Sequence, residues 1–361
     1  MSNQSMDPFP TVMSSTAAFS TSSVSLVPDN STSGVSPTFV FDITAANDLT
    51  SRANYVYSVF AALGFASACF LLYSFILTYR AQRRLAWLDC LLWAFCGFQL
   101  LLLLLSFSAM AHRPKYLVAT GLGCAALSFT INTASLCGLL LLVLMAYVLT
   151  FDPPSHALLR RPGVCAALVV LVSVLSCLLL AGLRGPNEDL GKEDNCYMDR
   201  VQAGPSYAVA KFCLAFLIPY ILQLGLLIGG CVRQWKSNGR FLSGSEEGPV
   251  FLTVTVVMFV CQLFYSVALL RAVQLEVVEE GEGGLRHRER AFLSVAEFVL
   301  FSGSCASLLL VLLIHRPCRE SLRGVVRQLR DCCRSPGRTQ THRHIIAPRI
   351  EIAETLQDFE P

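Results

Sequence analysis

The sequence has few charged residues, which make up 15% of its 361 positions, while hydrophobic residues make up 54%. An ordinary soluble domain carries about 25% charged residues, so this shortage argues against a water-soluble fold. The alternation typical of a membrane barrel is also missing. Apolar residues instead form blocks of about 20 or more, the length with which an α-helix crosses a hydrocarbon core of ~30 Å. Because backbone amides must be paired in lipid, the sequence predicts an all-α protein in a lipid bilayer.

Motifs of enzymes and of nucleic-acid-binding proteins are missing as well. We find no Gly-rich phosphate loop, no His-Glu-x-x-His and no paired carboxylates inside the apolar blocks. We therefore expect no enzyme activity, no cofactor and no metal. The formal charge of +3 is too small to predict a nucleic-acid partner. Most of the 15 cysteines, such as Cys69 and Cys137, lie inside apolar blocks, where we expect them to pack rather than to form a disulfide framework.

Seven apolar blocks are long enough to span a membrane, and together they form a predicted transmembrane domain over residues 51–316. The third block is longer than a membrane requires, so it is expected to tilt or to project beyond the bilayer. No repeat relates the two halves, which argues against a transporter built from duplicated units. The predicted spans are 54–79, 86–110, 118–149, 163–183, 206–232, 250–272 and 291–315.

Residues 1–50 are rich in Ser, Thr, Asn and Pro and contain no apolar segment of a cleavable signal peptide. They predict a disordered tail. Asn3 and Asn30 each begin an acceptor sequon for glycosylation, although a chance match in a Ser/Thr-rich stretch explains each of them equally well. With this tail outside the cell, the inner segments hold 17 Lys and Arg residues and the outer segments hold ten. The bias predicts a multi-pass plasma-membrane protein with an extracellular N-terminus.

A basic amphipathic segment over residues 317–333 follows the last span. Its apolar side chains recur at helical spacing, which predicts a short eighth helix lying on the membrane surface. Cys332 and Cys333 at its end are candidates for palmitoylation or are free thiols. Residues 334–361 are predicted to form a disordered cytoplasmic tail. The four apolar positions are Leu322, Val325, Val326 and Leu329.

Two ionisable residues lie inside predicted spans, Lys211 in the fifth and Glu297 in the seventh. Such residues are costly in a membrane and are functional candidates by default. They could hold the two ends of a polar or zwitterionic ligand, or each other. Alternatively, Lys211 extends its ammonium to the interface and Glu297 pairs with an arginine such as Arg290. Polar residues that could complete a pocket, or simply join helices, are Ser128, Asn132 and Tyr265.

Seven spans, an outer tail and a basic amphipathic helix together resemble the rhodopsin-like (class A) G-protein-coupled receptors over residues 54–333. Pro219 in the fifth span is similar to the family's proline site. The segment 259–265 resembles the sixth-helix motif in order, with Gln262 for Trp and Phe264 for Pro. Ser307 stands where the family's seventh-helix motif has Asn. The resemblance implies a seven-helix bundle that binds an extracellular ligand between the outer halves of its helices and signals through a heterotrimeric G protein.

The chain departs from the family at sites that carry signalling. Met145, Ala146 and Tyr147 occupy the place of the third-helix Asp-Arg-Tyr motif, which is the G-protein-coupling region of the family. Gln99 stands at the site of the sodium-binding carboxylate, with Ser135 as a further component, so we expect no tight sodium site. The resemblance therefore indicates a divergent, orphan-like member, and it leaves G-protein coupling an open question.

The family's loop-to-helix disulfide has its counterpart in Cys124, at the outer end of the third span, and Cys196, in the second outer loop. The resemblance implies that these two cysteines pair, which would fix the loop over the mouth of the bundle.

Three hypotheses follow for the function. The first is an atypical receptor of this family. The second is a seven-helix protein that does not signal, acting as a scaffold, a decoy or a partner of another receptor. The third is a carrier or channel, which the scarcity of charged groups in the inner halves of the spans disfavours.

Overall fold

The computed structural model describes residues 37–82, 87–111, 121–151, 161–183, 199, 204–236, 248–278 and 283–334. The elements are all helical within these ranges. They are α1 (Pro37–Gln82), α2 (Trp87–Ala111), α3 (Gly121–Thr150), α4 (Pro162–Leu183), α5 (Gly204–Phe212), a π-helix (Cys213–Leu217), α6 (Ile218–Lys236), α7 (Gly248–Val278), α8 (Gly283–Ile314) and α9 (Arg316–Arg334).

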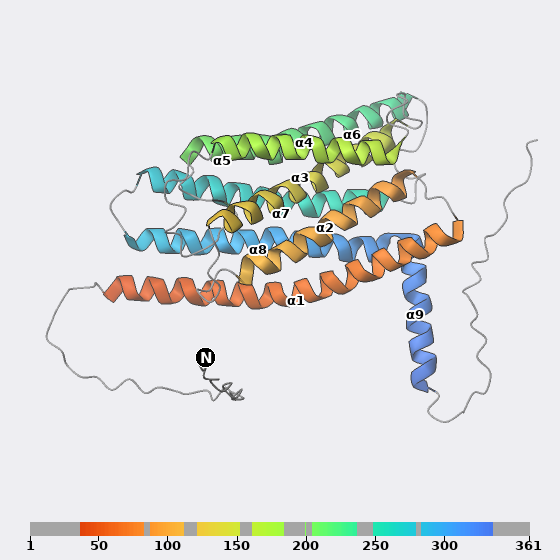
Figure 1. Ribbon diagram of the computed structural model, residues 1–361, viewed down its shortest axis with the longest axis horizontal. Coiled ribbons are helices and arrows are strands. Elements are labelled where there is room, and N and C mark those ends of the chain that lie inside the picture. Colours follow the sequence, from red (N-terminus) through yellow and green to blue (C-terminus); the bar gives the residue numbers. More distant parts are fainter. Residues whose placement is uncertain are drawn as a thin grey trace, which may run out of the picture.

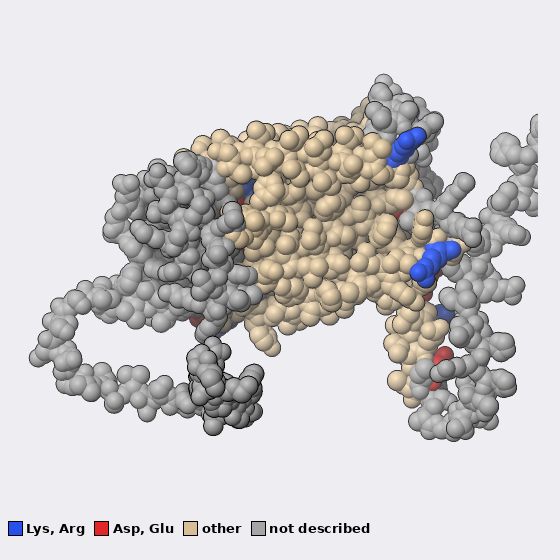
Figure 2. Space-filling model, in the orientation of Figure 1, with Lys and Arg blue, Asp and Glu red and all other residues tan. Residues whose placement is uncertain are grey.

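Seven spans run side by side and form one bundle, in which α5, the π-helix and α6 make a single span (Figure 1). Seven helices in the described residues are long and apolar enough to cross a membrane. Figure 2 shows uncharged side chains along the visible flank of the bundle and charged ones at its two ends. The predicted all-α fold with seven membrane-crossing helices is confirmed.

The centre of the bundle is formed by α3, which packs against α2, α4 and α6, while α8 packs against α1 and α7. Small residues bring these helices close together. A Cβ added to Gly64 on α1 would lie 2.8 Å from the Cβ of Cys305 on α8. A Cβ added to Gly303 on α8 would lie 2.9 Å from the Sγ of Cys261 on α7. Such close backbone contacts are how helices associate in lipid, where no hydrophobic effect drives them together.

The fifth span contains a turn of π-helix over Cys213–Leu217, which ends two residues before Pro219. Proline has no N–H, and its ring collides with the carbonyl four residues earlier in a regular helix. The wider turn removes this clash, and the N–H of Ile218 bonds the carbonyl of Cys213 instead. The sequence drew attention to Pro219 but did not predict the turn.

Two helices begin earlier than the sequence predicted. The helix α1 begins at Pro37, within the segment 1–50 that we expected to be a disordered tail. Proline suits the first turn of a helix, where its missing N–H costs nothing, and the exposed i,i+4 pair of Asp48 and Arg52 at 3.0 Å supports the added turns. The helix α8 also begins earlier, at Gly283, although its membrane-crossing part, Ala291–Ile314, matches the predicted span 291–315.

The helix α9 runs across the direction of the seven spans at one end of the bundle, which we call the α9 end (Figure 1). It begins at Arg316, directly after His315 interrupts α8. Val325, Val326 and Leu329 on it are exposed to 36%, 55% and 60%. Since no described part of the chain covers this apolar face, its orientation suits a helix that lies in a membrane surface, and that placement stays a prediction.

Candidate functional site

A network of polar side chains is buried at the end of the bundle opposite α9. Lys211 on α5 donates hydrogen bonds to the carboxylate of Asp199 and, at 2.7 Å, to Oδ1 of Asn132 on α3. The hydroxyls of Tyr207 on α5 and Tyr265 on α7 both donate to Asp199. We call these five residues the Asp199 cluster. They tie α3, α5 and α7 to a residue that precedes α5.

The two buried charges of the Asp199 cluster are balanced by each other and by hydrogen bonds. Asp199 is fully buried and Lys211 is 5% exposed, so each charge lies outside water. Burial alone would raise the pKa of the Asp199 carboxyl, but the charge of Lys211 and the hydrogen bonds from Lys211, Tyr207 and Tyr265 together lower it below its usual value. The Lys211 ammonium also lies 5.2 Å from the centroid of the Tyr265 ring, which adds a cation–π contact. The cluster therefore holds an ionised pair.

The sequence predicted three members of this cluster, namely Lys211, Asn132 and Tyr265, and the structure brings them together. Lys211 is buried, so it does not reach the interface as the alternative interpretation proposed. Ser128, one turn before Asn132 on α3, is buried at 3% exposure. Glu297 on α8 is fully buried, but its pairing with Lys211 stays a prediction. The side chain of Arg290, its suggested alternative partner, lies outside the described part.

Asp199 was missed because it is one of five acidic residues in the segment between the fourth and fifth spans, and no motif distinguishes it from its neighbours. Its only signal is proximity to the fifth span. It lies five residues before Gly204, whose φ of 84° turns the chain into α5. A loop carboxylate this close to a buried lysine is a natural partner for it.

Cys124 on α3 takes part in a disulfide bond. Cys196, its predicted partner, lies outside the described residues, so the pairing itself stays a prediction. Asn3 and Asn30 also lie outside them. Cys333 on α9 is an exposed free thiol, as palmitoylation would require, and the side chain of Cys332 is not described.

A second polar contact joins three helices at the α9 end. Nε2 of His315 lies 3.3 Å from Oδ1 of Asp89 on α2, and Nδ1 lies 3.3 Å from Sγ of Cys318 on α9. Burial would lower the pKa of His315, but its hydrogen bonds to Asp89 and Cys318 raise it from 6.5 to about 9. The ring of Phe75 on α1 packs on the imidazole with centroids 5.7 Å apart. The imidazolium thus joins the ends of α2 and α8 to the start of α9.

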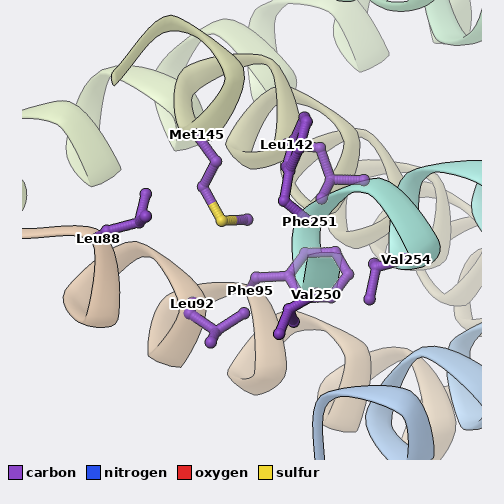
Figure 3. A pocket seen from close by; sticks show the side chains of 8 residues that line it. All are labelled: Leu88, Leu92, Phe95, Leu142, Met145, Val250, Phe251 and Val254. Atoms are coloured by element: carbon purple, nitrogen blue, oxygen red, sulfur yellow. The ribbon is translucent and has the colours of Figure 1, made fainter. Parts of the chain in front are cut away.

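Met145 and Ala146, two of the three residues at the place that resembles the third-helix motif of class A receptors, face an apolar interior. Met145 is 3% exposed and Ala146 is fully buried, while Tyr147 is half-buried. Figure 3 shows Met145 reaching from α3 toward α2 and α7, beside a cavity of about 20 Å³ whose lining is entirely apolar. An arginine at position 146 would enter this core, so it could not be accommodated without repacking.

Gln99 on α2 is fully buried against Gly138 of α3. A Cβ added to Gly138 would lie 2.7 Å from Nε2 of Gln99. The side-chain amide of Gln99 has no hydrogen-bond partner among the described residues. Ser135 is buried on the same face of α3, one turn earlier. Gln99 and Ser135, which the resemblance puts at the place of a receptor sodium site, therefore both lie in the bundle interior.

In comparisons with known proteins, no protein-family model matches the chain, and no curated protein sequence matches it.

Proposed function

We propose that this protein is a divergent class A G-protein-coupled receptor, and that the Asp199 cluster marks its ligand pocket. The observation that carries the proposal is the buried Lys211–Asp199 pair, which joins α3, α5 and α7 at one end of a seven-helix bundle. In this family the ligand binds between the outer halves of the corresponding helices. Charged side chains inside a membrane are costly, and a pair that is kept there is a strong functional candidate.

The proposed orientation puts the Asp199 cluster outside the cell and α9 in the cytoplasm, as the Lys and Arg bias indicates. A bond between Cys124 and Cys196 would hold the second outer loop over the bundle. The chain would then be fixed before Asp199 by this bond and after it by α5. Asp199 then occupies part of the pocket itself. We propose that a ligand with an acidic group competes with Asp199 for Lys211, and that this exchange alters the contacts among α3, α5 and α7.

The test is ligand-independent G-protein activation by the full chain in cells, measured at matched surface levels. Asp199→Asn and Lys211→Met weaken the pair, whereas Arg52→Gln breaks only the exposed pair with Asp48 and serves as the control. A shift of about 1 kcal/mol between two receptor states changes activation about fivefold. We expect such a change in both cluster variants and none in the control. If a variant does not reach the surface, Tyr265→Phe weakens the cluster with a smaller change.

A second candidate function is a seven-helix protein that does not signal. The apolar surroundings of Met145 and the buried Ala146 favour it, because the place of the family's coupling arginine holds no ionisable group. This candidate predicts surface expression and activation equal to that of untransfected cells for the wild type and every cluster variant. That result would contradict the receptor proposal.

A further inference from the structure

A groove opens on the flank of the bundle, away from the Asp199 cluster. The helices α4 and α6 both pack on α3 but share few contacts with each other, and the space between them has a volume of about 350 Å³. Leu144 of α3 lies in its floor, and Leu226 of α6 lines one side. On α4, Leu168 and Val172 are 46% and 48% exposed. All lining residues are hydrophobic, so the groove suits a hydrocarbon chain.

The lined part of the groove covers about two thirds of one half of a bilayer. Its lining on α3 runs from Leu140 to Tyr147, which is seven residues or ~10 Å at 1.5 Å per residue. One leaflet of a ~30 Å hydrocarbon core is ~15 Å thick. Because α3 ends at the α9 end of the bundle, a chain lying in the groove would emerge there.

Aromatic and cationic groups surround the mouth of the groove at the α9 end. Tyr147 lines the groove, and its ring lies 5.1 Å from that of Phe151 one turn later. The guanidinium of Arg233 on α6 lies 5.6 Å from the Phe151 ring. Arg233 follows Leu226 by seven residues, so both lie on the same face of α6, two turns apart.

A second arginine approaches the mouth from α4. Arg161 directly precedes this helix and lies seven residues, about two helical turns, before Leu168, which puts it at the α9 end of α4. Arg161 and Arg233 are both exposed. The groove thus has apolar walls, then aromatic residues at its rim, then two cations. A phospholipid has the matching order of acyl chain, interfacial region and anionic headgroup.

We propose that the groove between α4 and α6 is a binding site for an anionic phospholipid of the leaflet at the α9 end. One acyl chain lies against Leu144, Leu168 and Leu226, and the phosphate and headgroup carboxylate contact Arg233 and Arg161. A sterol would fill the apolar part but would leave both arginines without an anionic partner. The site is separate from the proposed ligand pocket and does not depend on receptor activity.

The test measures which lipids remain bound to the full chain. The protein is reconstituted in phosphatidylcholine nanodiscs that contain a minor fraction of phosphatidylserine and cholesterol, then extracted with mild detergent and examined by mass spectrometry. Arg233→Gln removes one headgroup contact, and Val172→Trp fills the groove. Arg271→Gln is the matched control. The side chain of Arg271 is 64% exposed, and it lies on α7 at the end of the bundle away from α9.

We expect the wild type to retain phosphatidylserine in excess of its bulk fraction. Arg233→Gln should lower this enrichment about fivefold, since one basic residue near a lipid surface contributes about 1 kcal/mol. Val172→Trp should reduce all retained phospholipid, and Arg271→Gln should match the wild type. Equal losses in the two arginine variants, no enrichment in the wild type, or retention of cholesterol in place of phospholipid would each overturn the proposal.

Discussion

Lys211 donates a hydrogen bond to Asp199, twelve residues earlier in the chain, and both side chains are buried at the end of a membrane-spanning bundle. Attraction between two buried charges outweighs the cost of their dehydration only if their other hydrogen-bonding groups are also satisfied. Tyr207, Tyr265 and Asn132 meet that condition. The pair therefore connects the chain before α5 to three spans.

Acid should weaken this connection. The pKa of Asp199 is lowered in the folded protein from its model-peptide value of 3.8, so its ionised form contributes stability above that value. The contribution is lost as the pH falls below 3.8 through the lowered pKa. We expect the apparent melting temperature of the detergent-solubilised wild type to fall over this range. Asp199→Asn should remove that part of the acid loss, and an identical acid profile in the variant would refute the assignment.

Alkali should weaken the opposite end of the bundle. The pKa of His315 is raised from 6.5 to about 9, so its contribution to stability is fully present below pH 6.5 and is lost as the pH rises toward 9. Melting temperatures measured across this window should fall for the wild type. In Asp89→Asn the fall should be smaller, because the carboxylate that stabilises the imidazolium is gone. A variant that loses as much stability as the wild type would contradict this explanation.

The close packing of α1 on α8 should make Gly64 sensitive to a single methyl group. Gly64→Ala places a Cβ 2.8 Å from the Cβ of Cys305, and overpacking of this kind costs about 1–3 kcal/mol. Gly97→Ala on α2 is the matched control, because a Cβ there meets nothing within 4 Å. Thermal unfolding should show a lower melting temperature for Gly64→Ala only. Equal behaviour of the two variants would mean that α1 and α8 are farther apart than the structure indicates.

Removal of one hydroxyl group from the Asp199 cluster should lower the melting temperature. Tyr265→Phe removes a hydrogen bond to a buried carboxylate while keeping the ring beside Lys211, and such bonds contribute about 1.5–3 kcal/mol. Tyr55→Phe on α1 changes a tyrosine that is 75% exposed and should have no effect. Comparison of the two melting temperatures tests whether the Tyr265 hydroxyl stabilises Asp199.

The sequence was sufficient to predict the spans because their signal, a continuous apolar block of membrane length, is local. The ends of the spans were less predictable. Pro37–Thr50 is too polar to resemble a span, yet it continues α1 as a helix, because helix propagation beyond a stable span needs no apolar face.

The candidate site was predictable only in part, for a physical reason. Lys211 and Asn132 stand out as polar residues in apolar surroundings, where polarity is costly. Asp199 lies among acidic loop residues that are ordinary in water, and its burial depends on how the chain before Gly204 turns. The contact between His315 and Asp89 was missed similarly, because it joins two helix ends that are 226 residues apart in the chain.

The most direct test of the central claim is a double-mutant cycle on Lys211 and Asp199. Lys211→Met, Asp199→Asn and the double variant would be compared with the wild type by thermal unfolding at neutral pH. Each single change should cost about 3 kcal/mol, because it leaves one charge buried without its partner, and the double variant should lose clearly less than both costs together. Costs that simply add would contradict the account, because they would mean that Lys211 and Asp199 do not stabilise each other.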